Sequence, residues 1–221
     1  MKGTEGANFA WLFWGILSLL VLQPLAQTGV PGIAASLEAA FTSLLLLGIW
    51  SLRPFRRWFI VALGLLAVDL LAVALHFTTK SPAWPLVSSI SLLAFCVLSA
   101  TLTMRFILSQ TRVDRNQILG AASVYLLLGV IWALLYGILC TFDTSALANV
   151  AAQSGGRSSG GELLYFSYVT LTTLGYGDVT PVSPIAKNLA LLEAVIGQLF
   201  LAVLIAGLVG RLASPGESRD G

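Results

Sequence analysis

The stretch LTTLGYGDVTP, residues Leu171 to Pro181, decides how the chain has to fold. It lies between two long apolar stretches, yet its Gly-Tyr-Gly-Asp run suits neither a membrane helix nor a strand. Unpaired carbonyls in hydrocarbon cost several kcal/mol each, so non-helical backbone at membrane depth is tolerated only where protein buries it or where it lines a water-filled path. The carbonyl groups of this stretch are therefore expected to face something polar.

The composition indicates a membrane protein. Of the 221 residues, 57% are apolar and 10% are charged, and the mean hydropathy is +0.89, whereas charged residues make up about a quarter of an ordinary soluble domain. A helix needs about 20 apolar residues to cross a bilayer. Six such windows predict six transmembrane helices, over about residues 9–27, 32–52, 58–77, 84–108, 117–140 and 185–212.

Basic residues indicate the orientation of these helices. Of the 12 Lys and Arg residues, most fall on one side of the predicted membrane: Lys2, Arg53, Arg56, Arg57, Arg105, Arg112, Arg115, Arg211 and Arg219. Cytoplasmic loops carry an excess of Lys and Arg, so we expect a multi-pass protein of the plasma membrane with both termini in the cytoplasm. A cleaved signal peptide is the alternative interpretation of the first window, although no clear small-x-small cleavage site follows it.

The second half contains an apolar segment that is too short to span. Residues 141–161 are polar and Gly/Ser-rich, which favours a flexible external loop. Residues 162–173, ELLYFSYVTLTT, are apolar and aromatic but cannot cross a bilayer. They predict a re-entrant helix between the fifth and sixth crossings, with Glu162 complementing the positive end of the helix dipole.

Two glycines follow this short helix. Gly175 and Gly177 alternate with Leu174 and Tyr176, and glycine allows backbone angles that are closed to residues with a Cβ. If the glycines adopt those angles, successive carbonyl groups can point the same way while the Leu and Tyr side chains point backward into the protein. A column of aligned carbonyl oxygens is suited to hold a dehydrated cation.

The run TLGYGD, Thr173–Asp178, resembles the selectivity filter of potassium channels, whose usual run is Thr-Val/Ile-Gly-Tyr/Phe-Gly-Asp. The preceding YFSYVTLTT is similar to their pore helix. The resemblance implies an all-α membrane protein with six transmembrane helices and, between the fifth and sixth, a re-entrant pore helix and filter. Leu174 departs from the usual Val or Ile. The resemblance also implies that K⁺ is held by the carbonyls of Thr173, Leu174, Gly175 and Tyr176 and by the Thr173 hydroxyl, with the Gly177 carbonyl at the outer mouth.

The resemblance extends to residues that support the filter. In these channels an aromatic residue of the pore helix, usually Trp, holds the filter aspartate, which here is Asp178. The matching positions are Tyr165 and Phe166, of which only Tyr165 can donate a hydrogen bond. Thr172, at the end of the pore helix, is expected to support the filter as well. The alternative is that Asp178 only starts the turn that leads to Pro181.

The last helix carries two candidate functional residues. Gly197 lies about midway along it, where family members have a hinge glycine that lets the cytoplasmic half splay open; the alternative is close helix packing. Glu193 is an acid inside the membrane, which is a functional hypothesis by default. It could bind behind the filter, face the cavity, or make a structural hydrogen bond to the pore helix.

The first four helices resemble a voltage-sensing unit. Asp69 is at the acidic position usual for the third helix, and Glu38 adds an intramembrane acid in the second; both are expected to pair with Arg53 or Arg56, or with water. Steep voltage gating needs about 3–4 moving charges in each subunit. Between Ser81 and Met104 there is no Arg or Lys, so we expect no strong voltage dependence.

Together these features predict a K⁺-selective channel that conducts passively. Its partners would be K⁺, membrane lipid and three further copies of itself, with no cofactor, nucleic acid or enzymatic activity. The predicted division is a sensor-like membrane domain (1–110), a cytoplasmic linker (111–117), a pore domain (118–213) and a short tail (214–221). The alternatives are a K⁺ uptake transporter subunit and a less selective cation channel.

Overall fold

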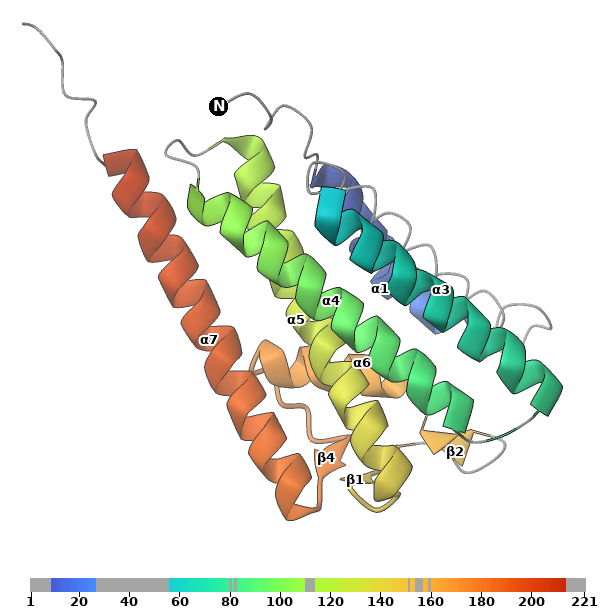
Figure 1. The fold of residues 1–221 in the computed structure, drawn as a ribbon. Coiled ribbons are helices and arrows are strands. Elements are labelled where there is room, and N and C mark those ends of the chain that lie inside the picture. The colour runs from blue at the N-terminus through green and yellow to red at the C-terminus, as the bar shows by residue number, and fades with distance from the viewer. Residues whose placement is uncertain are drawn as a thin grey trace, which may run out of the picture.

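The computed structural model describes residues 9–26, 56–79, 81, 83–109, 114–150, 152–153, 157–158 and 160–213. Within them the chain forms helices and very short strands that are joined by turns and loops (Figure 1). The helices are α1 (Ala10–Ala26), α3 (Arg56–Thr79), α4 (Ala83–Ser109), α5 (Arg115–Phe142), α6 (Gly160–Leu171) and α7 (Pro184–Ala213). The strands are β1 (Leu147–Ala148), β2 (Ala152–Gln153), β3 (Arg157–Ser158) and β4 (Thr180–Pro181).

Four of these helices are long and apolar enough to cross a membrane. Among the described residues they cover Arg57–His76, Ala83–Ser109, Arg115–Phe142 and Pro184–Gly207. The first predicted crossing coincides with α1, which has 17 residues, and the second, 32–52, lies outside the described residues. The expectation of an α-helical membrane protein is therefore confirmed, and the number of crossings stays a prediction.

Local sequence sets the ends of the helices in the second half. Asp114 caps α5, since its carboxylate accepts a 2.7 Å hydrogen bond from the Gln117 N–H. At the start of α7, the Ser183 hydroxyl oxygen accepts from the Ala186 N–H over 3.2 Å, and Pro184 occupies a first-turn position that needs no N–H donor. Both α5 and α7 thus begin at residues that satisfy free backbone donors.

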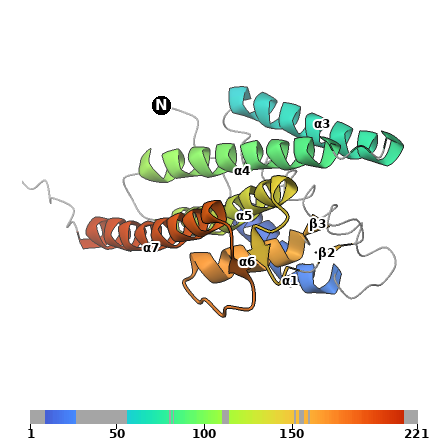
Figure 2. The same cartoon turned by 90° about the horizontal axis from the view of Figure 1, so that it is seen from below.

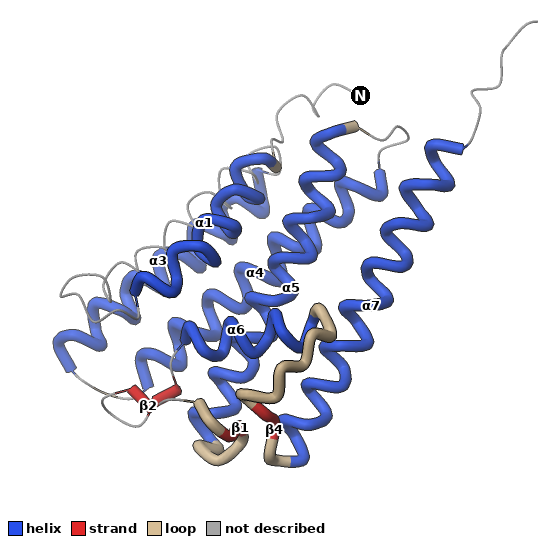
Figure 3. The backbone as a smooth tube through the Cα atoms, turned by 180° about the vertical axis from the view of Figure 1, so that it is seen from behind, coloured by secondary structure: helices blue, strands red, loops and turns tan. Residues whose placement is uncertain are grey.

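The long helices pack side by side, with α5 at the centre. Helix α4 contacts α3 on one side and α5 on the other, and α5 also contacts α1, α6 and α7. Figures 1 and 2 show α7 beside α5, at the edge of the bundle away from α3. The short helix α6 runs across the direction of the long helices, next to α5 and α7 (Figure 3). This arrangement positions the segment that follows α6.

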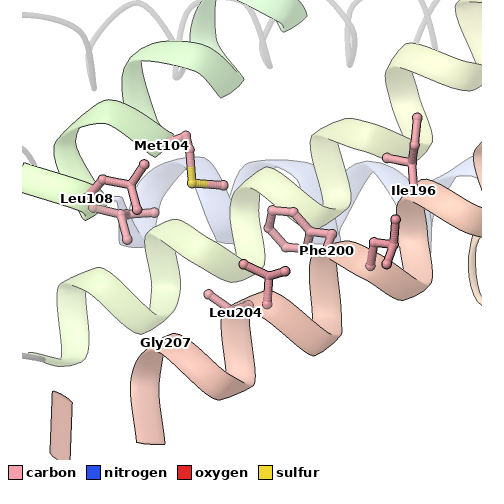
Figure 4. Close-up of a pocket in the computed structure, with 9 residues that line it drawn as sticks. Met104, Leu108, Ile196, Phe200, Leu204 and Gly207 are labelled. Atoms are coloured by element: carbon pink, nitrogen blue, oxygen red, sulfur yellow. The ribbon is translucent and has the colours of Figure 1, made fainter. Parts of the chain in front are cut away.

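A cavity of about 360 Å³ lies between α4 and α7 (Figure 4). Every residue that lines it is apolar: Met104, Ile107, Leu108, Ile196, Leu199, Phe200, Val203, Leu204 and Gly207. The backbone of α7 lies closest to α6 and α5, with a smaller contact to β4. The position of α7 is therefore set mainly by the second half of the chain.

Two details differ from the sequence-based expectations. The pore helix spans Gly160–Leu171 rather than 162–173, so it begins and ends two residues earlier. The segment after α5, expected to be an external loop, contains short strands, because β1 pairs with β4 and β2 pairs with β3, both antiparallel. Leu147 faces Pro181 in the first pairing, and this joins the segment before α6 to the segment after it.

Candidate functional site

The filter segment, Thr173–Asp178, begins where α6 ends. The Thr173 N–H donates to the Thr170 carbonyl, and the Leu174 N–H reaches back to the Val169 carbonyl, both over 2.9 Å. This bond pair is that of a Schellman motif, which closes a helix with one residue in the left-handed region. Thr173 is that residue, with φ of +59°. The helix therefore ends before Thr173, whereas the sequence predicted that it would include this residue.

Left-handed backbone recurs at every second residue of the filter segment. Gly175 has φ of +59° and Gly177 has φ of +81°, after the +59° of Thr173, while Leu174 and Tyr176 do not have positive φ. The glycine angles agree with the expectation, because glycine adopts them readily. The left-handed Thr173 was not predicted, since this conformation costs a β-branched residue about 1–3 kcal/mol.

The filter segment lies on the surface of the single chain. Leu174 and Tyr176 are 55% and 67% exposed, so the same chain does not bury their side chains, and the expected backward orientation stays a prediction for the assembled protein. A Cβ added at Gly175 or Gly177 would meet no atom within 4 Å. The Gln198 amide of α7 reaches the Thr173 hydroxyl over 3.5 Å at the inner end of the segment.

The outer end of the filter segment is fastened to two other parts of the chain. The Tyr165 hydroxyl of α6 donates to the Asp178 carboxylate over 2.7 Å. The Asn149 side-chain amide, from the loop after α5, donates to the Asp178 backbone carbonyl over 2.9 Å. Of the two aromatic positions expected to support the filter, Tyr165 makes the bond, while Phe166 is buried and packs edge-to-face on Tyr136.

The Asp178 carboxyl is held in its charged form. The hydrogen bond from Tyr165 lowers the pKa of Asp178 below its ordinary value, partial desolvation opposes the shift, and the Val179 N–H adds to the lowering. Asp178 therefore stays ionised at neutral pH and continues to accept the Tyr165 bond. Among the other predicted supports, the Thr172 hydroxyl donates to the Tyr168 carbonyl over 2.6 Å, within the last turn of α6.

Glu193 lies in a fully buried polar cluster between α5, α6 and α7. The Tyr136 hydroxyl donates to Glu193 Oε2 over 2.7 Å, and the Ser167 hydroxyl lies 2.5 Å from Oε1. Ser167 also donates to the Gly129 carbonyl over 2.7 Å. Of the three interpretations weighed for Glu193, the structure shows the hydrogen bond to the pore helix. Its partners lie far from it in the sequence and were not predicted.

Gly197 packs directly against the end of α6. A Cβ at Gly197 would lie 2.6 Å from the Leu171 carbonyl oxygen and 2.8 Å from its Cδ1. Since real Cβ contacts are longer than 3.0 Å, only glycine fits here without a shift of the backbone. Close packing at Gly197 is thus present in the structure, and the hinge stays a prediction.

Helix α5 approaches α6 as closely from the other side. A Cβ at Gly129 would meet the Tyr168 ring at 2.5 Å, and the Tyr168 hydroxyl donates to the Leu126 carbonyl over 2.6 Å. The Tyr125 hydroxyl contacts the Leu171 carbonyl over 3.4 Å. Helix α6 is therefore clamped between α5 and α7, which fixes where the filter segment starts.

In the first half of the chain, Asp69 is buried and pairs with a neighbouring helix. Its carboxylate accepts a 2.6 Å hydrogen bond from the Ser88 hydroxyl of α4, which is not one of the partners expected from the sequence. The predicted acid Glu38 and the predicted partner Arg53 lie outside the described residues. The Asp69–Ser88 bond joins α3 to α4 and is distant in the chain from the filter segment.

Comparison with known proteins identifies the second half of the chain. Residues 121–214 match a family model described as an ion channel. Over 69 residues the chain is 38% identical to two pore potassium channel c of Oryza sativa subsp. japonica, covering 31% of this chain and 15% of that one. It is 38% identical over 55 residues to two-pore potassium channel 3 of Arabidopsis thaliana, covering 25% of this chain and 13% of that one.

A bacterial relative matches as well. The chain is 39% identical over 54 residues to the inward rectifier potassium channel Kirbac3.1 of Paramagnetospirillum magnetotacticum, covering 24% of this chain and 18% of the relative. The chain thus spans less than a fifth of the length of each of these curated relatives. No solved structure matches the chain.

Proposed function

Because the chain belongs to the potassium channel family, we propose that it forms a passive, K⁺-selective pore from four identical copies. Membership of this family makes it a channel protein and not an enzyme. The observation that carries the proposal is the alternation of left-handed backbone at Thr173, Gly175 and Gly177, between a short helix and the last long helix.

The alternation gives the filter segment a chemical role. Reversing the handedness at every second residue lets successive carbonyls point to one side, where they replace the hydration shell of K⁺. In the proposed pore the ion is held by the carbonyls of Thr173, Leu174, Gly175 and Tyr176, with the Thr173 hydroxyl at the inner end. The Gly177 carbonyl lies at the outer mouth, and K⁺ passes as a permeant ion.

Exposure of apolar surface supports the assembly of four chains. In the single chain, 11% of the apolar window of α7 is buried, against 44% for both α4 and α5. Leu174 and Tyr176 are also exposed. Three further copies around a shared axis would cover both surfaces and complete the ring of carbonyls.

The direction of α6 suits a cation at the centre of such an assembly. Its first turn carries Glu162, and its carboxyl end, at Leu171, leads directly into the filter segment. A helix carries about half a negative elementary charge at that end. Four copies aimed at a water-filled cavity would stabilise a cation below the filter.

The first half of the chain is proposed as a sensor-like domain with little voltage dependence. In the proposed topology six crossings leave both termini in the cytoplasm of a plasma-membrane protein, and residues 1–110 are assigned to the first domain, 111–117 to the linker, 118–213 to the pore domain and 214–221 to the tail. The Asp69–Ser88 hydrogen bond is a static link between α3 and α4. The only basic residue of α4 is Arg105, near its inner end.

Ion flux in liposomes tests the proposal. The full chain is reconstituted in vesicles of phosphatidylethanolamine and phosphatidylglycerol, and K⁺ efflux and Na⁺ efflux are recorded down matched gradients. K⁺ flux well above Na⁺ flux is expected from the wild type. Gly175→Asp should abolish it, because a side chain strains the backbone at the φ of +59° and the added carboxylate would disturb the carbonyl column. Gly207→Ala is the matched control, since an added Cβ there meets no atom within 4 Å.

The outcomes separate the competing functions. Equal K⁺ and Na⁺ flux would identify a less selective cation channel. Transport that requires a coupled ion gradient would identify an uptake transporter subunit. Wild-type protein that remains monomeric in the bilayer, or flux that persists in the Gly175→Asp variant, would overturn the proposed pore.

A further inference from the structure

We infer that Glu193 and Gly197 of α7 are positioning residues that set where the pore helix α6 lies, and through it the geometry of the K⁺-binding carbonyls. The inference rests on the proposed function, since it assigns the two residues to the same conduction site. This part of α7 then supports α6, whereas the sequence suggested a hinge at Gly197.

The spacing of the contacts on the two helices is the first support. Glu193 and Gly197 are four positions apart on α7, and their partners Ser167 and Leu171 are four positions apart on α6. Residues at i and i+4 lie on one face of a helix, one turn apart. Two successive turns of α6 therefore rest on two successive turns of α7, which fixes both the height and the direction of α6.

The upper contact is a polar cluster with every carboxyl oxygen engaged. Glu193, Ser167 and Tyr136 are each fully buried, and the distances are 2.7 Å to Tyr136 and 2.5 Å to Ser167. A hydroxyl has one hydrogen, so Ser167 either shares it between Glu193 and Gly129, or donates it to Gly129 and accepts a hydrogen bond from a protonated Glu193 carboxyl. In both arrangements the cluster joins α5, α6 and α7 at one point.

The chemistry of this cluster allows a conservative replacement. Glutamine can accept from Tyr136 with its oxygen and donate to Ser167 with its amide. Alanine can do neither and leaves two buried hydroxyls without their partner, which weakens the contact. A positioning role thus predicts rescue by Gln and loss with Ala at the same site.

The lower contact is a close approach of backbone to backbone. A Cβ built at residue 197 would lie 2.6 Å from the carbonyl oxygen of Leu171, which is the last residue of α6. A side chain at 197 must therefore displace the end of the helix, two residues before Thr173. Tyr125 approaches the same carbonyl from α5 over 3.4 Å, so the displaced helix has little room on that side.

The experiment compares ion selectivity among variants of the full chain in planar bilayers, using the reversal potential under opposed K⁺ and Na⁺ solutions. The variants are Glu193→Gln, Glu193→Ala, Ser167→Ala and Gly197→Ala. Matched controls are Gly207→Ala on α7, where an added Cβ meets no atom within 4 Å, and Ser123→Ala, whose hydroxyl donates to the Leu119 carbonyl of its own helix. Each variant is first shown to elute with the same assembly size as the wild type.

Glu193→Ala and Gly197→Ala are expected to lower the K⁺/Na⁺ permeability ratio by about tenfold, Ser167→Ala by less, while Glu193→Gln and both controls retain it. A Gly197→Ala variant that changes open probability but keeps the wild-type ratio would favour the hinge and overturn the inference. An equal fall of the permeability ratio in Glu193→Gln and Glu193→Ala would also overturn the inference. If the wild type itself shows no preference for K⁺, the proposed function fails and the inference fails with it. If the wild type and all variants prefer K⁺ equally, only the inference fails.

Discussion

The hydroxyl of Tyr165 donates a 2.7 Å hydrogen bond to the carboxylate of Asp178, and it thereby ties α6 to the outer end of the filter segment. The two residues are 13 positions apart, and Tyr165 precedes residues 173–177 in the sequence whereas Asp178 follows them. The bond is therefore a brace across the segment, and Tyr165 is one of the two positions that the resemblance to potassium channel filters had implied for such a contact.

Removing this brace should destabilise the conducting state. In Tyr165→Phe the ring stays and the donor is lost, so K⁺ flux is expected to decline severalfold faster after its start than in the wild type. The measurement is the time course of K⁺ current in planar bilayers. Asp178→Asn alone and in combination with Tyr165→Phe serves as the control: if the two residues act as one pair, the double variant declines no faster than the faster single variant.

The same pair predicts a dependence on external pH. Because the pKa of Asp178 is lowered in the folded protein, the stabilisation is present above the ordinary pKa of an aspartate and is lost as pH falls through the lowered value. Wild-type flux should therefore persist at mildly acidic pH and decline only below about pH 3.8, the ordinary aspartate value. Tyr165→Phe should move the decline to higher pH. Identical pH profiles of the two proteins would contradict the role given to the hydrogen bond.

The close approach of α5 and α6 predicts a cost for a methyl group at Gly129. A Cβ there would lie 2.5 Å from the Tyr168 ring, and overpacking of this kind costs about 1–3 kcal/mol. Gly129→Ala should lower the unfolding temperature of the protein in detergent. The control is Gly64→Ala on α3, where an added Cβ meets nothing within 4 Å and alanine favours the helix. An unchanged or raised stability of Gly129→Ala would show that α6 can move away at no cost.

Voltage should have little effect on opening. One charge that crosses the full field changes the energy by about 2.3 kcal/mol per 100 mV, and α4 contains a single basic residue, Arg105. Current recorded across a voltage ramp should follow the driving force without steep activation. Steep activation that requires several charges per subunit would mean that the first four helices carry a moving charge outside α4.

The sequence predicts the elements of the second half closely, because hydropathy and turn residues are local signals. The last crossing was expected over 185–212 and is found at Pro184–Ala213. The pore helix was displaced by two residues, since its end depends on Thr173 adopting a left-handed conformation. No local propensity favours that conformation for threonine, and the hydrogen bonds back to Val169 and Thr170 stabilise it.

The partners of the site residues were harder to predict than the residues themselves. Glu193 was recognised as an unusual acid, but its contacts Tyr136 and Ser167 lie 57 and 26 positions away. Asn149, which holds the Asp178 carbonyl, lies in a segment that composition marks only as polar. Such contacts depend on tertiary packing, which a single sequence does not specify through periodicity or composition.

The pairing of β1 with β4 has a consequence for chain length. The filter segment is fixed at its inner end by the contact of Leu171 with Gly197, and at its outer end by the pairing of Thr180 with Ala148. The number of residues between these two anchors is therefore set by geometry, and in the proposed assembly of four chains an insertion or deletion there would shift the carbonyls out of register. Changes of length are to be absorbed outside these anchors, as in the polar stretch between β1 and α6.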